Sequence, residues 1–388
     1  MTVTSWAAAH ALASSAPRPL AARPVALRAA TGLVTAAEVR GAAPSPAFDS
    51  AAMDGYAVSG PGPWVVTGRR LAGSAVACSL AAGTALEIAT GATLPAGCDA
   101  VVPYEDGERD GDVVSAPPPA RDHIRRAGED SRPGDVLLPA GRIVTAVAAA
   151  ALAQAGVDEV LAHPRPAVTV LVTGDEVVPR DAPAPLGPGQ VRDAFTGVVA
   201  AVAARAGAAP PAHHHVRDDR AALAAAIGSA GGDVVAVTGA SSRGAADHLR
   251  EVLAGLGGRW LVDGVECRPG HPQGLAALPD GRWVVSLPGN PYAGLVAVLT
   301  LLEPLLARLA GRPPAPARRL PVDGEARLHP AGARIVPVVL DRVTDGARAT
   351  IVAGSRPAGL RAAAAADALA VLDPGWRPGA DATLLALP

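Results

Sequence analysis

The chain has 388 residues, a formal net charge of −2 and a sequence pI of about 6.5. This nearly neutral balance argues against a general nucleic-acid binder and against a protein of acidic membrane surfaces. All basic residues are arginine, and 49% of the residues are hydrophobic while only 3% are aromatic. We therefore expect an aliphatic core, divided by length among about two to four domains.

Cysteine usage and hydropathy narrow the class of protein further. Cys78, Cys98 and Cys267 form no Cys-x-x-Cys pattern, so neither a disulfide framework nor a zinc site is expected, and a reducing cytoplasm fits. Polar residues, Gly or Pro interrupt every apolar run before it reaches about 18 residues, so we expect no membrane span. The Ala-rich residues 5–15 predict a helix and not a signal peptide.

Changes of pattern along the chain predict its domains. Residues 1–44 and 134–165 have helical character, and residues 45–133 between them alternate short strands with Gly and Pro, as an inserted β-rich module would. Residues 166–311 alternate strands with helices, which is typical of an α/β layer domain with a mostly parallel sheet. Residues 312–388 open with a Pro-rich linker over 312–321, then alternate in period two around Asp345-Gly346, and so predict a small β domain.

Four expected strands of the α/β domain each run into a polar loop. The strands cover 168–172, 212–216, 233–237 and 283–287, and helices are expected at 196–205, 220–229, 246–256 and 291–309. The loops are Thr173-Gly174-Asp175-Glu176, Arg217-Asp218-Asp219, residues 238–244 with Asp247 beyond, and Pro288-Gly289-Asn290-Pro291. Because parallel strands end at one sheet edge, Glu176, Asp218, Asp247 and the Asn290 turn should face one crevice.

Carboxylates next to Gly-rich loops and helix N-termini suit a phosphate-bearing ligand with a hard cation such as Mg²⁺. Taken singly, Asp175 and Asp218 fit helix caps equally well. Four such loops on one edge favour the ligand site. The run His213-His214-His215 is different, because only His213 and His215 share a strand face, and a structural or solvent role is favoured over metal binding.

The turn before residue 291 predicts an anion site. Asn290 suits an N-cap, Pro291 suits the first helical position, and Gly289 lets a ligand approach the backbone. A free helix N-terminus there would bind an anion. The simpler alternative is a well-capped turn with no ligand.

Seven segments, in this order, resemble the MoeA family of molybdopterin molybdenumtransferases, which the gephyrin E domain also represents. They are 50–58 (with Met53-Asp54-Gly55-Tyr56-Ala57), 90–97, 126–130, 173–176, 217–219, 242–247 and 287–291. The resemblance runs essentially from end to end, including the final β domain. It implies four domains and a homodimer whose site lies between one subunit's α/β domain and the partner's β module.

The resemblance also implies a reaction. Adenylylated molybdopterin and molybdate would react in a Mg²⁺-dependent step that leaves molybdenum on the pterin dithiolene and releases AMP. The candidate catalytic carboxylates are Asp54, Asp130, Glu176, Asp218 and Asp247, of which Glu176, Asp218 and Asp247 are candidate Mg²⁺ ligands. The candidate binding residues are Thr90, Thr173, Gly174, Ser242, Arg243, Gly244, Arg268, His271, Pro288, Gly289, Asn290 and Pro291.

Some candidate anion-binding positions depart from the family pattern. Its Lys-Pro-Gly-Lys-Pro segment is Arg268-Pro269-Gly270-His271-Pro272 here, so Arg268 keeps a charge while an ordinary imidazole is mostly neutral at pH 7. Arg243 adds a cation in the neighbouring loop. Two alternatives follow, namely a degenerate paralogue that binds molybdopterin or a partner without inserting metal, and a nucleotidyl transferase acting on the pterin.

Overall fold

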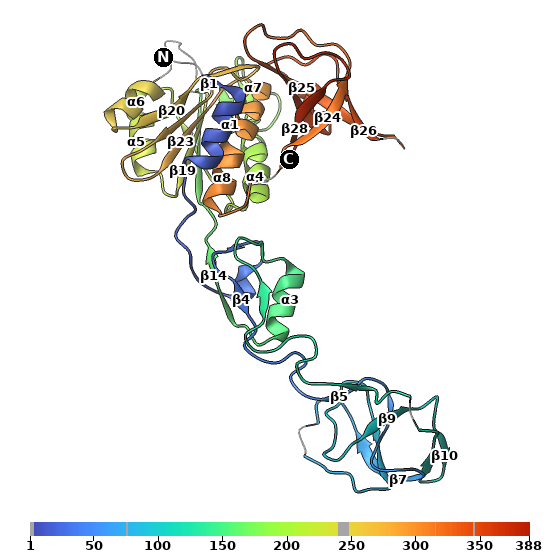
Figure 1. Cartoon of the computed structure of the whole chain (residues 1–388). Coiled ribbons are helices and arrows are strands. Elements are labelled where there is room, and N and C mark those ends of the chain that lie inside the picture. The colour runs from blue at the N-terminus through green and yellow to red at the C-terminus, as the bar shows by residue number, and fades with distance from the viewer. Residues whose placement is uncertain (1–3, 75–76, 119, 240–247, 315, 344–345) are drawn as a thin grey trace. The chain divides into compact units, whose positions relative to one another are not determined.

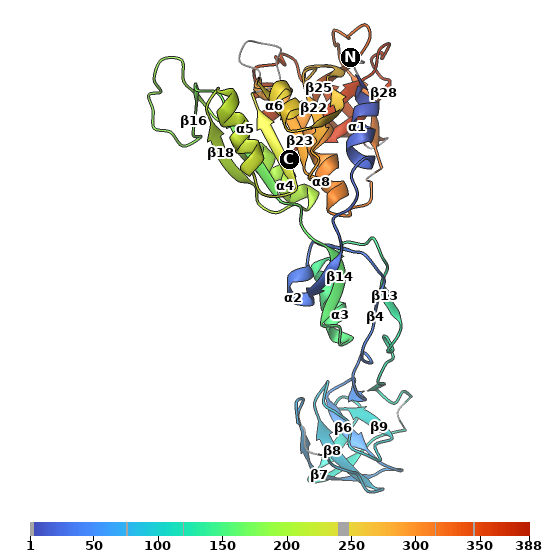
Figure 2. The ribbon, with the colours of Figure 1, turned by 90° about the vertical axis from the view of Figure 1, so that its left-hand side faces the viewer.

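The structure is a computed structural model that describes the chain except residues 1–3, 75–76, 119, 240–247, 315 and 344–345. Its internal contacts divide it into two units (Figures 1 and 2). We call residues 24–161 the β-module unit, and residues 1–23 with 162–388 the α/β–barrel unit.

A six-stranded sheet forms the centre of the α/β–barrel unit. Its order is β18 (Ala212–Val216), β15 (Val168–Thr173), β19 (Val234–Thr238), β23 (Trp283–Leu287), β22 (Gly274–Ala277) and β20 (Arg259–Asp263). The first four strands are parallel, and β22 and β20 return antiparallel. β15, β19 and β23 are nearly continuous runs of buried residues, as expected for strands covered on both faces.

Helices cover both faces of this sheet, which confirms the expected α/β/α layers (Figure 1). One face packs against α1 (Trp6–Ser15), α4 (Thr196–Ala206), α7 (Pro291–Ala297) and α8 (Glu303–Leu309), and the other packs against α5 (Arg220–Ser229) and α6 (Leu249–Gly255). The expected helix 291–309 is continuous, but its middle turn, Val298–Leu302, is a π-helix. By length and composition this helix could cross a membrane, yet 83% of it is buried inside the protein as a core helix.

The C-terminal residues form a closed β-barrel. Its strands are β24 (Arg318–Asp323), β25 (Ala333–Val343), β26 (Gly346–Ile351), β27 (Ala368–Leu372) and β28 (Asp381–Ala386), with the short helix α9 (Arg361–Ala364). The ring closes because β25 pairs with both β26 and β27, while β24 joins β26 to β28 and β28 pairs with β27. β21 (Val265–Arg268) and β1 (Thr4–Ser5) extend its sheet from β25. β24 also begins inside the segment expected as a Pro-rich linker.

Among its described residues, the β-module unit contains four sheets, two in the inserted module and two in the segments that flank it. A six-stranded sheet has the order β10 (Glu108–Asp110), β11 (Val113–Ser115), β7 (Trp64–Arg70), β8 (Thr84–Ile88), β6 (Gly55–Val58) and β9 (Ala100–Pro103), next to the ribbon β5 (Ser50–Ala51) and β12 (Ile124–Arg125). The flanking segments form β2 (Arg23–Ala26), β14 (Glu159–His163), β3 (Val34–Thr35), the pair β4 (Val39–Arg40) and β13 (Val136–Leu138), and helices α2 (Leu27–Ala30) and α3 (Ala146–Gln154).

The structure differs from the expected helical first domain in two respects. The segments around the module hold a three-stranded sheet as well as two helices. In this sheet β14, which contains Val160, pairs with β3, which contains Val34, on one side and with β2 on the other. The first helix, α1, belongs instead with the α/β–barrel unit. There the Trp6 indole donates a hydrogen bond to Thr300 Oγ1 at 3.0 Å. A tertiary contact, and not the local sequence pattern, therefore places α1 in the α/β–barrel unit.

Candidate functional site

The polar loops of the α/β domain leave the sheet at one level, as the sequence predicts. In the strand register Thr173 lies beside Val216, Val172 beside Thr238, and Thr238 beside Leu287. The residues that follow these strands therefore lie along one sheet edge, the position at which open parallel sheets bind ligands. We call this edge, with Gly174, Asp175, Glu176, Asp218 and the turn 288–290, the carboxyl-edge site.

Two aspartates face each other across this edge. The Asp175 amide donates to Asp218 Oδ2 and the Asp218 amide donates to Asp175 Oδ1, each at 3.4 Å. Asp175, Glu176 and Asp218 are exposed. Glu176 lies close to Gly174, whose φ is +120°, and an added Cβ there would meet Glu176 Oε2 at 2.7 Å. Asp218 Oδ1 takes no part in the reciprocal bonds, and both Asp218 and Glu176 are exposed.

Buried hydrogen bonds hold the strand ends in place. Thr173 is 7% exposed, and its hydroxyl donates to the Thr238 carbonyl at 2.5 Å. Gly239 follows with a φ of +82°, and a Cβ at that position would meet Thr173 Oγ1 at 2.8 Å. The ring of His215 donates from Nε2 to the Gly174 carbonyl at 2.9 Å, since a carbonyl can only accept. His215 therefore has the structural role that the sequence favours.

The N-terminus of α7 differs from the prediction. Asn290 is the N-cap residue and Pro291 opens the helix, but the Asn290 side chain makes no capping hydrogen bond. The amides of Tyr292 and Ala293 both donate to the Pro357 carbonyl, at 3.1 and 3.3 Å. Residue 357 lies in a loop of the barrel, so this loop takes up the donors that were expected to be free for an anion. The amides of Tyr292 and Ala293 are therefore occupied in this structure, whereas an anion contact by residues 288–291 stays a prediction.

Tyr292 fastens α7 to the barrel at a second point. Its hydroxyl donates to the Ile335 carbonyl on β25 at 3.1 Å. Burial raises the pKa of this hydroxyl strongly, and the nearby Arg334 charge opposes that shift. The barrel thus lies directly beside the start of α7, and Arg334 lies within electrostatic range of Tyr292.

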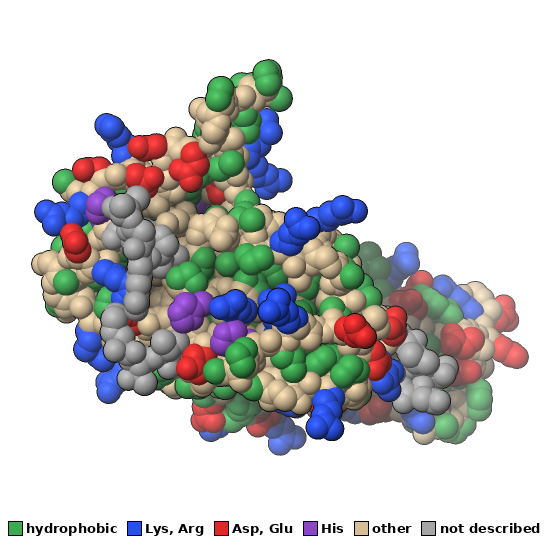
Figure 3. All heavy atoms as spheres, turned by 90° about the horizontal axis from the view of Figure 1, so that it is seen from above, with side chains coloured by type: hydrophobic (Ala, Val, Ile, Leu, Met, Phe, Trp, Pro, Cys, Tyr) green, Lys and Arg blue, Asp and Glu red, His purple; other side chains and the backbone are tan. Residues whose placement is uncertain are grey.

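A pair of arginines lies at this junction. Arg268 on β21 and Arg334 on β25 are in register on parallel neighbouring strands, so both side chains leave the same face. Arg268 is exposed, and Arg334 Nε is buried without a hydrogen-bond partner among the described residues. Among the described residues, neither Arg268 nor Arg334 forms a salt bridge with a carboxylate. On the face shown in Figure 3, arginine and histidine side chains gather among hydrophobic ones.

His271 is exposed, and its Nδ1 lies 2.8 Å from the Val265 carbonyl. Because a carbonyl can only accept, the Nδ1–H donates to it. A contact between His271 and an anion stays a prediction, and Arg334 is a further basic residue that the sequence reasoning missed. Its signal was a charged residue among the alternating apolar residues of 333–338.

Predicted residues of the β-module unit also come together. Asp54 Oδ1 accepts the Thr90 amide at 2.7 Å. The Asp130 amide donates to the Ser45 carbonyl at 3.0 Å, and β5 pairs with β12, which joins the segments 45–58 and 124–130. The side chains of Asp54, Thr90 and Asp130 are exposed. Hydrogen bonds therefore link the segments that carry the three motifs of this unit, which spacing alone did not predict.

Four predicted residues, Ser242, Arg243, Gly244 and Asp247, lie outside the described residues. Among those that are described, no group of three or more His, Cys, Asp or Glu side chains could hold a metal ion. Glu176 and Asp218 still fit a Mg²⁺ ion, which usually takes one or two carboxylates and completes its shell with water and phosphate oxygens.

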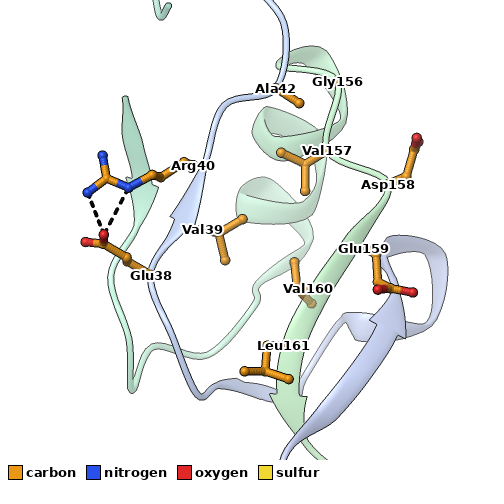
Figure 4. A pocket seen from close by; sticks show the side chains of 10 residues that line it. All are labelled: Glu38, Val39, Arg40, Ala42, Gly156, Val157, Asp158, Glu159, Val160 and Leu161. Atoms are coloured by element: carbon orange, nitrogen blue, oxygen red, sulfur yellow. Dashed lines mark hydrogen bonds and ion pairs between the residues drawn. The ribbon is translucent and has the colours of Figure 1, made fainter. Parts of the chain in front are cut away.

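A separate cavity of about 290 Å³ lies in the β-module unit (Figure 4). Val39, Val157, Val160 and Leu161 line it, and the ion pair between Glu38 and Arg40 lies at its side. The predicted site residues are absent from its described lining, so we do not assign the cavity to the site.

The chain matches two family models. One, described as the MoeA N-terminal region (domain I and II), matches residues 4–156, and the other, described as a probable molybdopterin binding domain, matches residues 169–308. The carboxyl-edge site thus lies in the segment matched by the second model. Fold and site together define a multidomain protein with a molybdopterin-binding α/β domain.

Curated relatives and a solved structure cover most of the chain. It is 34% identical to molybdopterin molybdenumtransferase 1 of Mycobacterium tuberculosis over 332 residues, 77% of this chain and 76% of that one. It is 33% identical to the molybdopterin molybdenumtransferase of Haemophilus influenzae over 279 residues, 69% of this chain and 68% of that one. The crystal structure of a molybdopterin biosynthesis MoeA protein from Pyrococcus horikoshii matches all of both chains with a TM-score of 0.78 and 26% identity. The chain belongs to the MoeA family of molybdopterin molybdenumtransferases, enzymes of molybdenum cofactor biosynthesis.

Proposed function

We propose that this enzyme inserts molybdate into adenylylated molybdopterin and releases AMP. The observation that carries the proposal is the carboxyl-edge site, where exposed Glu176 and Asp218 follow two adjacent parallel strands of the domain matched as molybdopterin-binding. A site for this chemistry needs cationic donors for molybdate and phosphate, and acidic groups for a divalent ion.

Arg268 and Arg334 supply the cationic part. Like charges side by side on neighbouring strands repel each other, and a bound oxyanion between them would relieve that repulsion with charge-assisted hydrogen bonds. In this chain the barrel residue Arg334 would provide a second positive charge beside Arg268. The first turn of α7 would then lie beside the anion, without donating hydrogen bonds to it from the amides of Tyr292 and Ala293.

Mg²⁺ would be held by Glu176 and Asp218, with Asp247 as a further candidate. When bound, the ion would offset the negative charge of the pyrophosphate. The chain's own part is to hold those carboxylates in place, and the reciprocal bonds between Asp175 and Asp218 do so. Thr173 and Gly174 set the level of this loop, and Gly289 and Asn290 form the opposite side of the site.

The site would be completed by a second subunit, whose Asp54, Thr90 and Asp130 approach the crevice in a homodimer. What supports this is that all three side chains are exposed and that Asp54 accepts a hydrogen bond from the Thr90 amide. The free cysteines fit a cytoplasmic enzyme.

The decisive experiment measures AMP release from adenylylated molybdopterin when molybdate is added to the purified protein. Arg334→Gln and Asp218→Asn should each lower the rate at least about a hundredfold, since each removes a charged contact to the reacting groups. Arg259→Gln, an exposed arginine on β20, is the matched control and should leave the rate unchanged. Binding of molybdopterin without AMP release by the wild type would favour the non-inserting paralogue.

The shared site has its own test. Asp54→Asn and Asp218→Asn variants, each inactive alone, are mixed and allowed to exchange subunits. A site built from two subunits predicts recovery of about a quarter of wild-type activity, because half of the dimers then carry one intact site of two. No recovery despite measured exchange would place both residues in one subunit's site.

A further inference from the structure

Phe48 presents an exposed aromatic ring in a chain that has few. It is one of only two phenylalanines, and it is 48% exposed, whereas Phe195 is 7% exposed in the core. Single exposed apolar residues are common on protein surfaces, so exposure alone assigns nothing. The hydrogen bonds made by the residues next to Phe48 are more informative.

The backbone on both sides of Phe48 is held by neighbouring segments. The Gly128 amide donates to the Pro46 carbonyl at 2.9 Å, and the Leu94 amide donates to the Asp49 carbonyl at 3.2 Å. The Asp49 carboxylate also accepts the Ala127 amide at 2.7 Å. Residue 48 therefore lies between two fixed points, and its ring is presented to solvent with little backbone freedom left to lose on binding.

Charged groups reinforce this arrangement. Arg126 donates to Asp49 Oδ2 at 3.2 Å and to Asp122 Oδ2 at 2.5 Å. The bond from the Ala127 amide, with help from Arg126, holds the pKa of Asp49 below its ordinary value, so the clamp is intact at neutral pH. The segment that carries Phe48 is thus built as a rigid element.

The segment that carries Phe48 is bonded to the motifs with the predicted site residues of the β-module unit. Ser45, three positions earlier in the chain, accepts the Asp130 amide through its carbonyl at 3.0 Å. Two positions later, Ser50 opens β5, which Gly91 joins by donating to the Ala51 carbonyl at 2.8 Å, next to Thr90 and its partner Asp54. Phe48 is thus carried by the segment whose backbone is bonded to the strands and loops that hold Asp54, Thr90 and Asp130.

We propose that Phe48 is a substrate-contact residue whose ring stacks on the pterin ring of molybdopterin. The inference rests on the proposed function, since the substrate supplies the flat heteroaromatic ring. Aromatic side chains prefer offset stacking on such rings, and base–aromatic stacking in other proteins changes affinity about tenfold to a hundredfold. The carboxylates nearby would then contact the polar edge of the pterin.

The test uses the full-length chain and titrates molybdopterin and AMP separately, following pterin fluorescence and bound AMP. Phe48→Leu keeps an apolar side chain but removes the flat ring, and should weaken molybdopterin binding about tenfold to a hundredfold. Phe48→Tyr should restore it to within about threefold, with the quenching of pterin fluorescence that stacking produces. Leu71→Ala, which removes a residue 55% exposed on the same unit, is the control and should change nothing.

The outcomes separate the two proposals. If the wild type fails to bind molybdopterin, the proposed function itself falls. If the wild type binds and Phe48→Leu binds equally well, only the stacking role is overturned. Loss of AMP affinity with unchanged molybdopterin affinity would indicate that the Phe48 ring stacks on adenine, and would also overturn the assignment. Circular dichroism of each variant confirms that the exposed substitution leaves the fold intact.

Discussion

Helices α5 and α7 both begin just after a parallel strand at the same sheet edge, and both have an Asp or Asn at the N-cap, yet they are capped in different ways. In α5 the Asp219 side chain accepts the Ala222 amide at 2.8 Å. In α7 the Asn290 side chain caps nothing, and the Pro357 carbonyl of the barrel accepts the amides of Tyr292 and Ala293. The cap of α5 is local, whereas that of α7 comes from another domain.

The difference changes what each helix start can do. The α5 cap would form in any chain with this local sequence, whereas the α7 cap exists only because the barrel packs against it. The tertiary cap occupies the amides of Tyr292 and Ala293, and the same packing brings Arg334 within electrostatic range of Tyr292. Four predictions test this contrast.

The largest effect should come from glycines inside the two helices. Gly294 in α7 lies against Phe195, and an added Cβ would be 1.9 Å from Phe195 Cε1 and 2.9 Å from the Pro288 carbonyl oxygen. Gly294→Ala should lower the free energy of unfolding of the α/β domain by about 3 kcal/mol, because neither the buried ring nor the backbone can move freely. Hydrogen exchange of the core strands measures it.

Gly228 in α5 is the matched control, since nothing lies within 4 Å of an added Cβ. Gly228→Ala should stabilise α5 by up to about 1 kcal/mol, because alanine restricts the unfolded chain and favours the helix. Equal effects of the two substitutions would contradict the tight packing of α7.

A smaller effect is expected at Thr173, which joins β15 to β19 below the carboxyl-edge site. Thr173→Val keeps the shape but leaves the buried Thr238 carbonyl without this donor, at a cost of about 1–3 kcal/mol. Thr173→Ser keeps the hydroxyl and should lose much less. Urea unfolding followed by hydrogen exchange at β15 and β19 distinguishes them, and a Thr173→Val protein as stable as wild type would show that the bond contributes nothing.

The caps themselves come next. Asp219→Ala should increase amide exchange in the first turn of α5, corresponding to about 1 kcal/mol. Asn290→Ala should change exchange in α7 by a few tenths of a kcal/mol at most, since the Asn290 side chain makes no capping bond. A loss at Asn290 as large as that at Asp219 would mean that α7 is capped locally after all.

The smallest effect concerns pH and α1, another helix held by tertiary contacts. Burial lowers the pKa of His10 below its ordinary 6.5, although its bond to the Thr300 carbonyl and the charge of Glu303 oppose this. Since the unfolded chain binds the proton more readily, this contribution to stability is complete above pH 6.5 and is lost as the pH falls through the lowered pKa.

Amide exchange in α1 should therefore speed up between pH 7 and pH 5, after correction for the intrinsic pH dependence of exchange. His10→Gln, which cannot titrate in this range, should remove that acceleration. If the acceleration persists in His10→Gln, another group is responsible.

Most of the fold could be predicted from local pattern. The strands at 212–216 and 283–287 and the helix at 220–229 have the bounds expected, and the four parallel strands end in the predicted polar loops. Period-two and helical spacing, together with caps such as Asp219, are interactions between residues close in sequence. The exposed positions of Glu176 and Asp218 after neighbouring parallel strands followed from the same logic.

The placement of α1, the cap of α7 and the presence of Arg334 beside Arg268 could not be predicted in this way. Each depends on a contact between residues far apart in the chain: Trp6 with Thr300, Tyr292 with Pro357, and Arg268 with Arg334. Residue pattern alone specifies where a helix starts and which loops share an edge, because those depend on local geometry. Only the packed domains decide which donors remain free and which charges meet, because those depend on what another part of the chain has already occupied.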